Sequence, residues 1–456
     1  MTSNSGSLFG TYVKSIARLS LPMTTSFLAM ALMGIVDTAI VGHYDTIQLA
    51  YIGLAHSIFV ILFTIPIGLL NGVVIKSSQK FGARKFQACG KIYNEDRKYA
   101  LCLSVIFLAI GFKGEIILRL LGQSPEMVKY SGEVLQIFVF SIPFILIYVN
   151  ANFFLQSIRR PQIATYGVLV ANVVNLIINP ILVWGIFGMP GLGAVGSATS
   201  TLIVRLCLAV YMLYYISRMK KNPKLNKRFG LDRSYSTWWS DSKATRQIGY
   251  GVAIMTIATN GSFSAVNHFA AWLGEQAMAT FVIISHISAM IMMLCFSISQ
   301  ATAIVAAGAY GRKDYKNILT AIRAGYTIQF SIMFILILVV YSFQTQIFGF
   351  FTQDKMVLDT IRNLVVFLLF EVFIDVQPLN ISAGLNAQGD VKIPTIFQII
   401  SFLIIRISAC YILAFTCGLG LKGLILGLLC GGISSFILNG SRLMFLIHRY
   451  NKKAEA

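Results

Sequence analysis

The chain has 456 residues, of which 56% are hydrophobic and only 12% are charged. Soluble domains carry roughly twice that share of charged residues, so the composition excludes an ordinary soluble protein. The net charge is +20, with 37 Lys and Arg against 17 Asp and Glu. Apolar residues come in long blocks and do not alternate with polar ones, which favours membrane-spanning helices over a membrane β-barrel.

Long apolar stretches recur along the chain at the length that a bilayer requires, roughly 20 residues per helix. We therefore expect an all-α integral membrane fold with twelve transmembrane helices. The predicted spans cover residues 15–42, 48–75, 99–118, 133–157, 162–185, 192–217, 247–272, 277–308, 318–345, 363–386, 392–415 and 421–448.

The Lys and Arg residues gather on one side of these spans. With the N-terminus in the cytoplasm, about 29 of the 37 fall in or near cytoplasmic segments, and two, Arg205 and Arg406, fall within spans. This positive-inside asymmetry predicts cytoplasmic termini in a bacterial-type inner (plasma) membrane. We interpret the basic stretch 218–246 as a cytoplasmic loop beside anionic lipid rather than a nucleic-acid patch. We expect the lipid bilayer as a partner, and we expect no nucleic-acid partner.

The first predicted span contains a proline and an acid. Pro22 should bend the helix, and Asp37 follows about four turns later. A carboxylate at the centre of a bilayer costs about 3 kcal/mol, so it should face a cavity and have a function.

The fifth predicted span carries a polar stripe. Asn172, Asn175 and Asn179 are spaced three and four residues apart, so they share one helix face. Ser197 lies on the sixth span opposite. Together with Asp37, these oxygens are what a hard monovalent cation needs. The alternative is hydrogen bonding between helices, which amides commonly make in membranes.

The tenth predicted span carries a second acidic site. Glu371 and Asp375 are four residues apart and share a helix face. Pro378 should break the helix just after them and free backbone carbonyl groups. A structural ion pair with Arg205 or Arg406 is the alternative to a functional role for these acids.

The chain repeats itself. Residues 81–85 recur as 310–314, and residues 191–196 recur as 418–423. An even number of spans per half makes this a parallel repeat. We expect two six-helix pseudo-symmetric lobes, an N-terminal lobe (1–217) and a C-terminal lobe (247–456), joined by the basic cytoplasmic linker 218–246.

Motifs for enzymes and cofactors are absent from the sequence. The seven cysteines show no metal-ligand spacing, and there is no phosphate-binding loop, zinc motif or nucleophile elbow. We expect no catalytic residue, no cofactor and no metal beyond a possible Na⁺ at Asp37.

Three groups of residues together resemble a known family. Leu21-Pro22 and the run from Val36 to His43 resemble the first span of the multidrug and toxic compound extrusion (MATE) family. The run Asn175 to Pro180, with residues 188–196, resembles its fifth and sixth spans, and Asp375-Val376-Gln377 resembles its tenth. The resemblance covers nearly the whole chain.

This resemblance implies a V-shaped pair of lobes and secondary antiport. Organic compounds would be exported by alternating access in exchange for inward Na⁺ or H⁺, with functional acids at Asp37 and Asp375. The chain departs from the family at two places. Many members have a glutamate in the seventh span, where this chain has only polar residues, and some have a second acid where it has Asn179. The coupling ion therefore stays open, and we favour Na⁺ because the amide stripe supplies neutral oxygens that a proton would not need.

Aromatic and polar residues near these sites are candidates to line a substrate cavity. They are Tyr148, Phe153, Phe154, Asn260 and Asn267. Aromatic faces beside acids attract organic cations, so we expect amphipathic cationic substrates and a transporter that acts as a monomer. The alternative is a flippase of lipid-linked oligosaccharide from the wider superfamily, although such proteins usually carry several cations in the cavity. An intramembrane enzyme or a passive channel fits the sequence less well.

Overall fold

The computed structural model describes residues 3–120, 122–186, 190–232, 238–352 and 354–455. Nearly all of these residues are helical, and none of them lies in a strand. The all-α prediction is confirmed. Gly188-Met189 of the family-like motif and residues 233–237 of the basic linker lie outside the described residues.

Contacts within the chain divide it into two units. One unit, here the N-terminal unit, comprises residues 25–253, and the other, the C-terminal unit, comprises residues 1–24 and 254–456. Helices α1 (Ser3–Tyr44) and α12 (Lys243–Trp272) each contribute residues to both units. The lobe boundaries at residues 217 and 247 that the sequence suggested stay a prediction.

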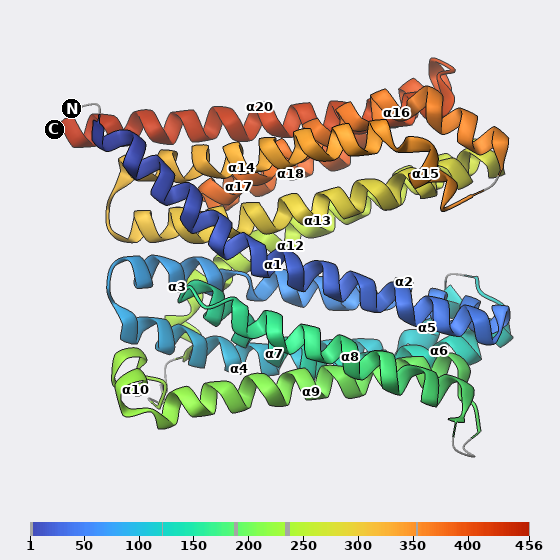
Figure 1. The fold of residues 1–456 in the computed structure, drawn as a ribbon, viewed down its shortest axis with the longest axis horizontal. Helices are drawn as coiled ribbons and strands as arrows, with labels where there is room; N and C mark the ends of the chain where they lie inside the picture. The colour runs from blue at the N-terminus through green and yellow to red at the C-terminus, as the bar shows by residue number, and fades with distance from the viewer. Residues whose placement is uncertain (1–2, 121, 187–189, 233–237, 353, 456) are drawn as a thin grey trace. The chain divides into compact units, whose positions relative to one another are not determined.

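The N-terminal unit is a bundle of long helices, coloured blue to green in Figure 1. Its long helices α8 and α9 lie side by side, and α7 packs against both α4 and α9. Besides parts of α1 and α12, its helices are α2 (Thr46–Leu70), α3 (Gly72–Gly82), α4 (Phe86–Gly111), α5 (Gly114–Leu120), α6 (Pro125–Phe140), α7 (Ile142–Ser157), α8 (Gln162–Trp184), α9 (Gly193–Lys221), α10 (Pro223–Phe229) and α11 (Trp238–Asp241).

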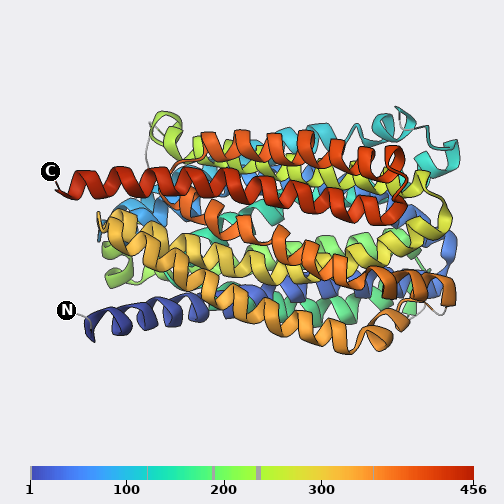
Figure 2. The same cartoon turned by 90° about the horizontal axis from the view of Figure 1, so that it is seen from above.

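The C-terminal unit is also a bundle of long helices. Its last helix is the long red helix in Figure 2. This helix, α20, packs against α16, α17, α19 and the two π-helices that flank α19. The unit contains α13 (Glu275–Gly311), α14 (Tyr315–Ser342), α15 (Gln344–Gly349), α16 (Lys355–Asp375), α17 (Gln377–Ala387), α18 (Lys392–Ile399), the π-helix η2 (Ile400–Arg406), α19 (Ile407–Tyr411), the π-helix η3 (Ile412–Thr416) and α20 (Gly420–Glu455).

All twelve predicted spans fall on helices. Ten helices of the described chain are long and apolar enough to cross a membrane, and α4 with α5, bent by 48°, makes an eleventh if the pair is one span. The seventh predicted span lies in α12, which is not among them. Polar residues in α12, such as Thr259, Asn260 and Asn267, lower its mean hydropathy.

Several spans are interrupted, and of the three breaks described here only the one at Pro378 was predicted from the sequence. α2 gives way to α3 at Asn71, and α6 gives way to α7 at Ser141, just before Pro143. The break between α16 and α17 falls at Val376, two residues before Pro378. Proline has no N–H to donate and its ring crowds the preceding turn, so a helix ends or kinks there. Pro22, by contrast, lies inside the continuous helix α1.

The two halves repeat the same unusual backbone turns. Arg84 and Lys313, at equivalent positions of the repeated motif, both adopt a left-handed conformation with φ of 59° and 62°. Arg159 and Gly389, which are 230 residues apart and each lie just after a helix, have φ of 66° and 83°. At each site the next residue donates a backbone hydrogen bond five residues back, as in a Schellman cap. Because a left-handed turn is costly for a residue with a Cβ, its recurrence supports the parallel repeat.

The first turns of α12 pack very closely on the break between α2 and α3. A Cβ on Gly249 would lie 1.9 Å from the carbonyl oxygen of Leu69, and a Cβ on Gly72 would lie 2.0 Å from that of Thr245. Only glycine permits backbones to approach this closely. The start of α12 is thus fixed to the N-terminal unit.

Candidate functional site

Asp37 lies at the centre of a buried polar cluster in the N-terminal unit. Its side chain projects from α1 and is 9% exposed. Asn179 of α8 donates a hydrogen bond from Nδ2 to Asp37 Oδ1, and Thr201 of α9 donates one from Oγ1 to Asp37 Oδ2 at 3.1 Å. One carboxylate therefore joins three helices. Hydrogen bonds to a charged acceptor in such surroundings are among the stronger ones.

Neutral oxygens surround this carboxylate. Asn175 lies next to Asp37, and its Nδ2 donates to Ser200 Oγ at 3.3 Å. The Oδ1 atom of Asn179 and the Oγ atom of Ser197 are buried and have no hydrogen-bond partner among the described residues. Buried polar atoms without partners are rare in proteins, and these two oxygens are therefore free to accept an ion or a hydrogen-bond donor. Carboxylate, amide and hydroxyl oxygens fit Na⁺.

Arg205 lies one turn beyond Thr201 on α9. Its Nη1 donates to Ser141 Oγ at 2.5 Å, at the break between α6 and α7. The guanidinium lies over the ring of Phe59, 4.6 Å from the centroid. It also interacts electrostatically with Asp37. The positive charge of Arg205 thus partly balances the buried carboxylate without an ion pair within contact distance.

The acids of the C-terminal unit are arranged differently. Asp375, at the end of α16, forms an ion pair with Arg406, at the end of η2. Asp375 is 4% exposed and Arg406 is fully buried. The ring of Phe402 lies below the guanidinium, 3.9 Å from the centroid. An ion pair with Arg205 or Arg406 is the alternative to a functional role that the sequence left open for these acids, and Asp375 pairs with Arg406.

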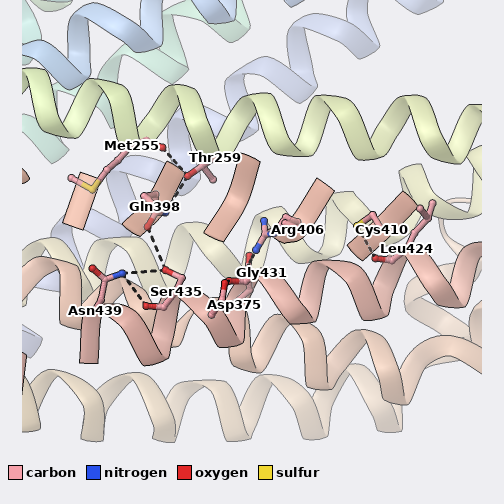
Figure 3. A network of polar contacts seen from close by, with 11 residues as sticks. Met255, Thr259, Asp375, Gln398, Arg406, Cys410, Leu424, Gly431, Ser435 and Asn439 are labelled. Carbon is pink, nitrogen blue, oxygen red and sulfur yellow. Dashed lines mark hydrogen bonds and ion pairs between the residues drawn. The ribbon is translucent and has the colours of Figure 1, made fainter. Parts of the chain in front are cut away.

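Two features of the chain make room for Arg406. The residue lies in a π-helix, where the wider backbone spacing shifts side chains from their ordinary α-helical positions, a feature frequent at functional sites. Opposite it, Gly431 of α20 has no side chain, and a Cβ there would lie 2.5 Å from Arg406 Nε. Figure 3 shows Arg406 and Asp375 meeting beside Gly431.

The helix break before Pro378 leaves carbonyl groups that side chains satisfy. Gln329 of α14 donates from Nε2 to the carbonyl of Val376 at 2.9 Å, and the hydroxyl of Tyr326 donates to that of Gln377 at 2.8 Å. The Oε1 atom of Gln329 accepts a bond from Asn380 at 2.6 Å. Buried amides therefore hold the break in a defined geometry.

A second polar track in the C-terminal unit crosses three helices. Gln398 of α18 donates to Thr259 of α12 and accepts from Ser435 of α20, both at 3.4 Å. Asn439 donates to the Ser435 carbonyl at 2.9 Å. Figure 3 shows this track beside the Asp375–Arg406 pair.

The residues proposed for the substrate cavity have unlike surroundings. Tyr148, Phe153 and Phe154 of α7 are at most 7% exposed. Phe154 packs against the rings of Tyr93 and Phe229, with centroids 4.9 and 6.1 Å away, which are contacts typical of a packed core. On α12, Asn260 is exposed and Asn267 is half-buried. A role for these five residues in substrate binding stays a prediction.

The structure brings together some of the expected site residues and adds others. Asp37, Asn175 and Asn179 meet, with Ser197 one turn from Thr201 on α9. Sequence reasoning missed Thr201, although its spacing of four residues from Ser197 places both on one helix face. It also gave no sign of the π-helix that carries Arg406. Among the described residues, no group of three or more His, Cys, Asp or Glu could hold a metal ion.

Comparisons with known proteins agree on one family. The chain matches the MatE family over residues 22–181 and 252–412, which is more than half of its length. It is 28% identical over 432 residues to the probable multidrug resistance protein NorM of Caulobacter vibrioides, covering 94% of this chain and 90% of that one. It is 24% identical to the multidrug resistance protein NorM of Vibrio cholerae, covering 95% of both. Among solved structures, a MATE protein in the bent conformation aligns over 100% of both chains with a TM-score of 0.87 at 21% identity.

Proposed function

The chain belongs to the MatE (MATE) family of multi-pass membrane transporters, and we propose that it exports organic compounds in exchange for a cation that enters the cell. As a member of this family it is a transporter and not an enzyme. The finer parts of the proposal are the coupling ion, the route that the ion takes and the class of substrate. Relatives named multidrug resistance proteins support a broad range of organic substrates.

The observation that carries the proposal is the Asp37 cluster. A buried carboxylate joins α1, α8 and α9 through Asn179 and Thr201. The buried neutral oxygens of Asn179, and of Ser197 one turn from Thr201, have no hydrogen-bond partner in the part of the chain that the structure describes. Asp37, Asn175, Asn179, Ser197 and Thr201 would supply the oxygens for Na⁺. The ion would then bind where three helices meet, so its arrival or release would change how they pack.

The charge of the acids supports organic cations as substrates. One cation, Arg205, lies near Asp37 in the N-terminal unit. In the C-terminal unit the two acids Glu371 and Asp375 lie near a single cation, Arg406. Amphipathic cations suit such a lining better than sugars or phosphorylated lipids do. We place the protein in the inner membrane of a bacterial-type cell, with both termini in the cytoplasm, and we expect a monomer.

Expression in a bacterium that lacks its own efflux pumps tests this proposal. The wild-type protein should raise tolerance to cationic dyes and antibiotics, whereas Asp37→Asn should lower tolerance to that of cells with an empty vector. Asp359→Asn is the matched control, because Asp359 is 71% exposed on α16. If a broad panel of cations has no effect and the purified protein moves lipid-linked oligosaccharide, the flippase alternative replaces this proposal.

A further inference from the structure

A pocket opens where the basic linker joins α12, within the N-terminal unit. Its volume is about 370 Å³. The described residues that line it come from α11 and the first two turns of α12, and they are Trp239, Ser240, Lys243, Arg246, Gln247 and Tyr250. None of them belongs to the Asp37 cluster.

Arg246 is fixed in the wall of this pocket. Its side chain is 6% exposed, and its Nη1 donates to the carbonyl of Trp239 at 2.6 Å and to Ser242 Oγ. The guanidinium also lies over the ring of Trp239, 3.7 Å from the centroid. The Nε and Nη2 atoms of Arg246 donate to no group in the part of the chain that the structure describes. An arginine held in this way presents free donors in a planar fork, which fits the oxygens of a phosphate group.

The wall of the pocket carries positive charge. Lys243 is exposed at the first residue of α12, and Arg246 follows three residues later. The other four described residues of the wall are uncharged. The pocket also lies at the amino-terminal end of α12, where the helix dipole stabilises an anion. The wall therefore favours an anionic ligand.

The acids near the pocket leave the free donors of Arg246 available. Asp241 of α11 pairs with Lys91 of α4 at 2.7 Å, and Glu95 lies 3.6 Å from the same ammonium group. Asp96 of α4 is 1% exposed and interacts electrostatically with Arg246. Neither carboxylate oxygen of Asp96 accepts a hydrogen bond from the described residues. Asp96 thus attracts the guanidinium without using its donors.

We propose that this pocket binds the phosphate of an anionic phospholipid headgroup, with Arg246 bonding the phosphate oxygens and Lys243 balancing their charge. Trp239 and Tyr250 are 53% and 43% exposed, and amphipathic rings of this kind gather where a membrane meets water. The predicted seventh span begins at Gln247, which places the pocket at the level of the headgroups. The cytoplasmic leaflet as the source of the lipid rests on the proposed orientation, whereas phosphate binding does not depend on export.

Thermal unfolding of the purified full-length protein in a maltoside detergent tests the inference. Short-chain phosphatidylglycerol should raise the unfolding temperature of the wild type, because a ligand that binds only the folded state stabilises it. Phosphatidylcholine of the same chain length should raise it less, since its headgroup has no net charge. Each rise is measured against the same variant without lipid, so a loss of basal stability does not affect the comparison.

Variants of the two cations locate the site. Lys243→Gln and Arg246→Gln should each raise the phosphatidylglycerol concentration for half the maximal response by about tenfold, because each loses a charge-assisted contact. Lys224→Gln is the matched control, since it removes one exposed charge from α10 of the same linker, outside the pocket. It should change that concentration by less than about threefold, because salt screens a distant charge. If Arg246→Gln does not fold, Lys243→Gln still decides the question.

The other outcomes separate the site from its alternatives. Equal effects of Lys243→Gln and Lys224→Gln would show only general attraction to the basic linker and would overturn the inference, as would no response to phosphatidylglycerol. An equal rise with sodium phosphate in place of lipid would support the phosphate site and overturn the lipid as its occupant. The expected lipid response in a protein that exports nothing would overturn only the proposed function.

Discussion

Thr201 and Thr199 lie two residues apart on α9, and their hydroxyl groups have different partners. The Thr201 hydroxyl lies 3.1 Å from Asp37 Oδ2 and 3.2 Å from the carbonyl of Ser197 in its own helix. Thr199 donates only to a carbonyl of its own helix, that of Val195, at 2.7 Å. A hydrogen bond to a charged group contributes about 1.5–3 kcal/mol, which corresponds to about tenfold or more in an equilibrium constant. Comparing variants of Thr201 and Thr199 therefore distinguishes the loss of the bond to the Asp37 carboxylate from the loss of any hydroxyl group on α9.

We predict that Thr201→Val raises the ion concentration for half-maximal transport by about tenfold, because Asp37 loses a donor. Thr201→Ser should keep most of the wild-type value. Thr199→Val should change it less than about threefold, since only a local bond is lost. Transport by reconstituted protein at a series of ion concentrations measures this. Equal effects of the two valine variants would argue against Thr201 as part of the site.

At the residue scale, spacing predicted part of the polar clusters. The spacing of four residues between Asn175 and Asn179 placed both on one helix face, and Asn179 does bond Asp37. The rotation of α9 about its axis decides which of its residues reaches the carboxylate. Tertiary packing sets that rotation, and the sequence alone does not reveal it. Arg406 illustrates the same limit, because a π-helix sets the direction of its side chain.

Among the elements, α12 contains one glycine that is tightly packed and another that has space for a side chain. Gly249 faces the carbonyl of Leu69, where a Cβ would lie at 1.9 Å, whereas the nearest atom to a Cβ on Gly261 is Leu403 Cδ2 at 3.8 Å. The first contact is between backbones, so no side chain can move to relieve it. The second is an ordinary van der Waals distance.

Gly249→Ala should therefore destabilise the purified protein by about 1–3 kcal/mol, the usual range for overpacking. Gly261→Ala should not destabilise it, because alanine is the better helix former and has space. Thermal unfolding in detergent, followed by tryptophan fluorescence or circular dichroism, compares the two. A Gly249→Ala variant as stable as the wild type would contradict the close packing of α12 on the α2–α3 break.

The positions of the elements were largely predictable, whereas only some of their interruptions were. All twelve predicted spans fall on helices, and ten helices of the described chain, or eleven with the bent pair α4 and α5, meet the length and hydropathy that a bilayer requires. Pro378 signalled the break between α16 and α17 through its missing N–H. The break at Ser141 precedes Pro143 in the same way, whereas the break at Asn71 depends on the contacts that the start of α12 makes with it. These tertiary contacts have no local signature in the sequence.

For the whole molecule, orientation follows from the distribution of Lys and Arg. Lys224, in α10 of the basic linker, and Lys129, in α6, are both exposed and should face opposite sides of the membrane. In a background with the seven native cysteines replaced, a thiol reagent that cannot cross the membrane should label Lys129→Cys in intact cells. It should label Lys224→Cys only after the cells are permeabilised. The reverse pattern would contradict cytoplasmic termini.

The central claim is that an ion gradient drives export through Asp37. The most direct measurement is uptake of a fluorescent organic cation into proteoliposomes, under a Na⁺ gradient alone or a pH gradient alone, with wild type and Asp37→Asn side by side. We predict that the Na⁺ gradient drives uptake by the wild type and that Asp37→Asn reduces uptake to the level of empty liposomes. Full uptake by the wild type under a pH gradient in Na⁺-free buffer would assign the coupling to protons. Gradient-driven uptake by Asp37→Asn at the wild-type rate would contradict the claim itself.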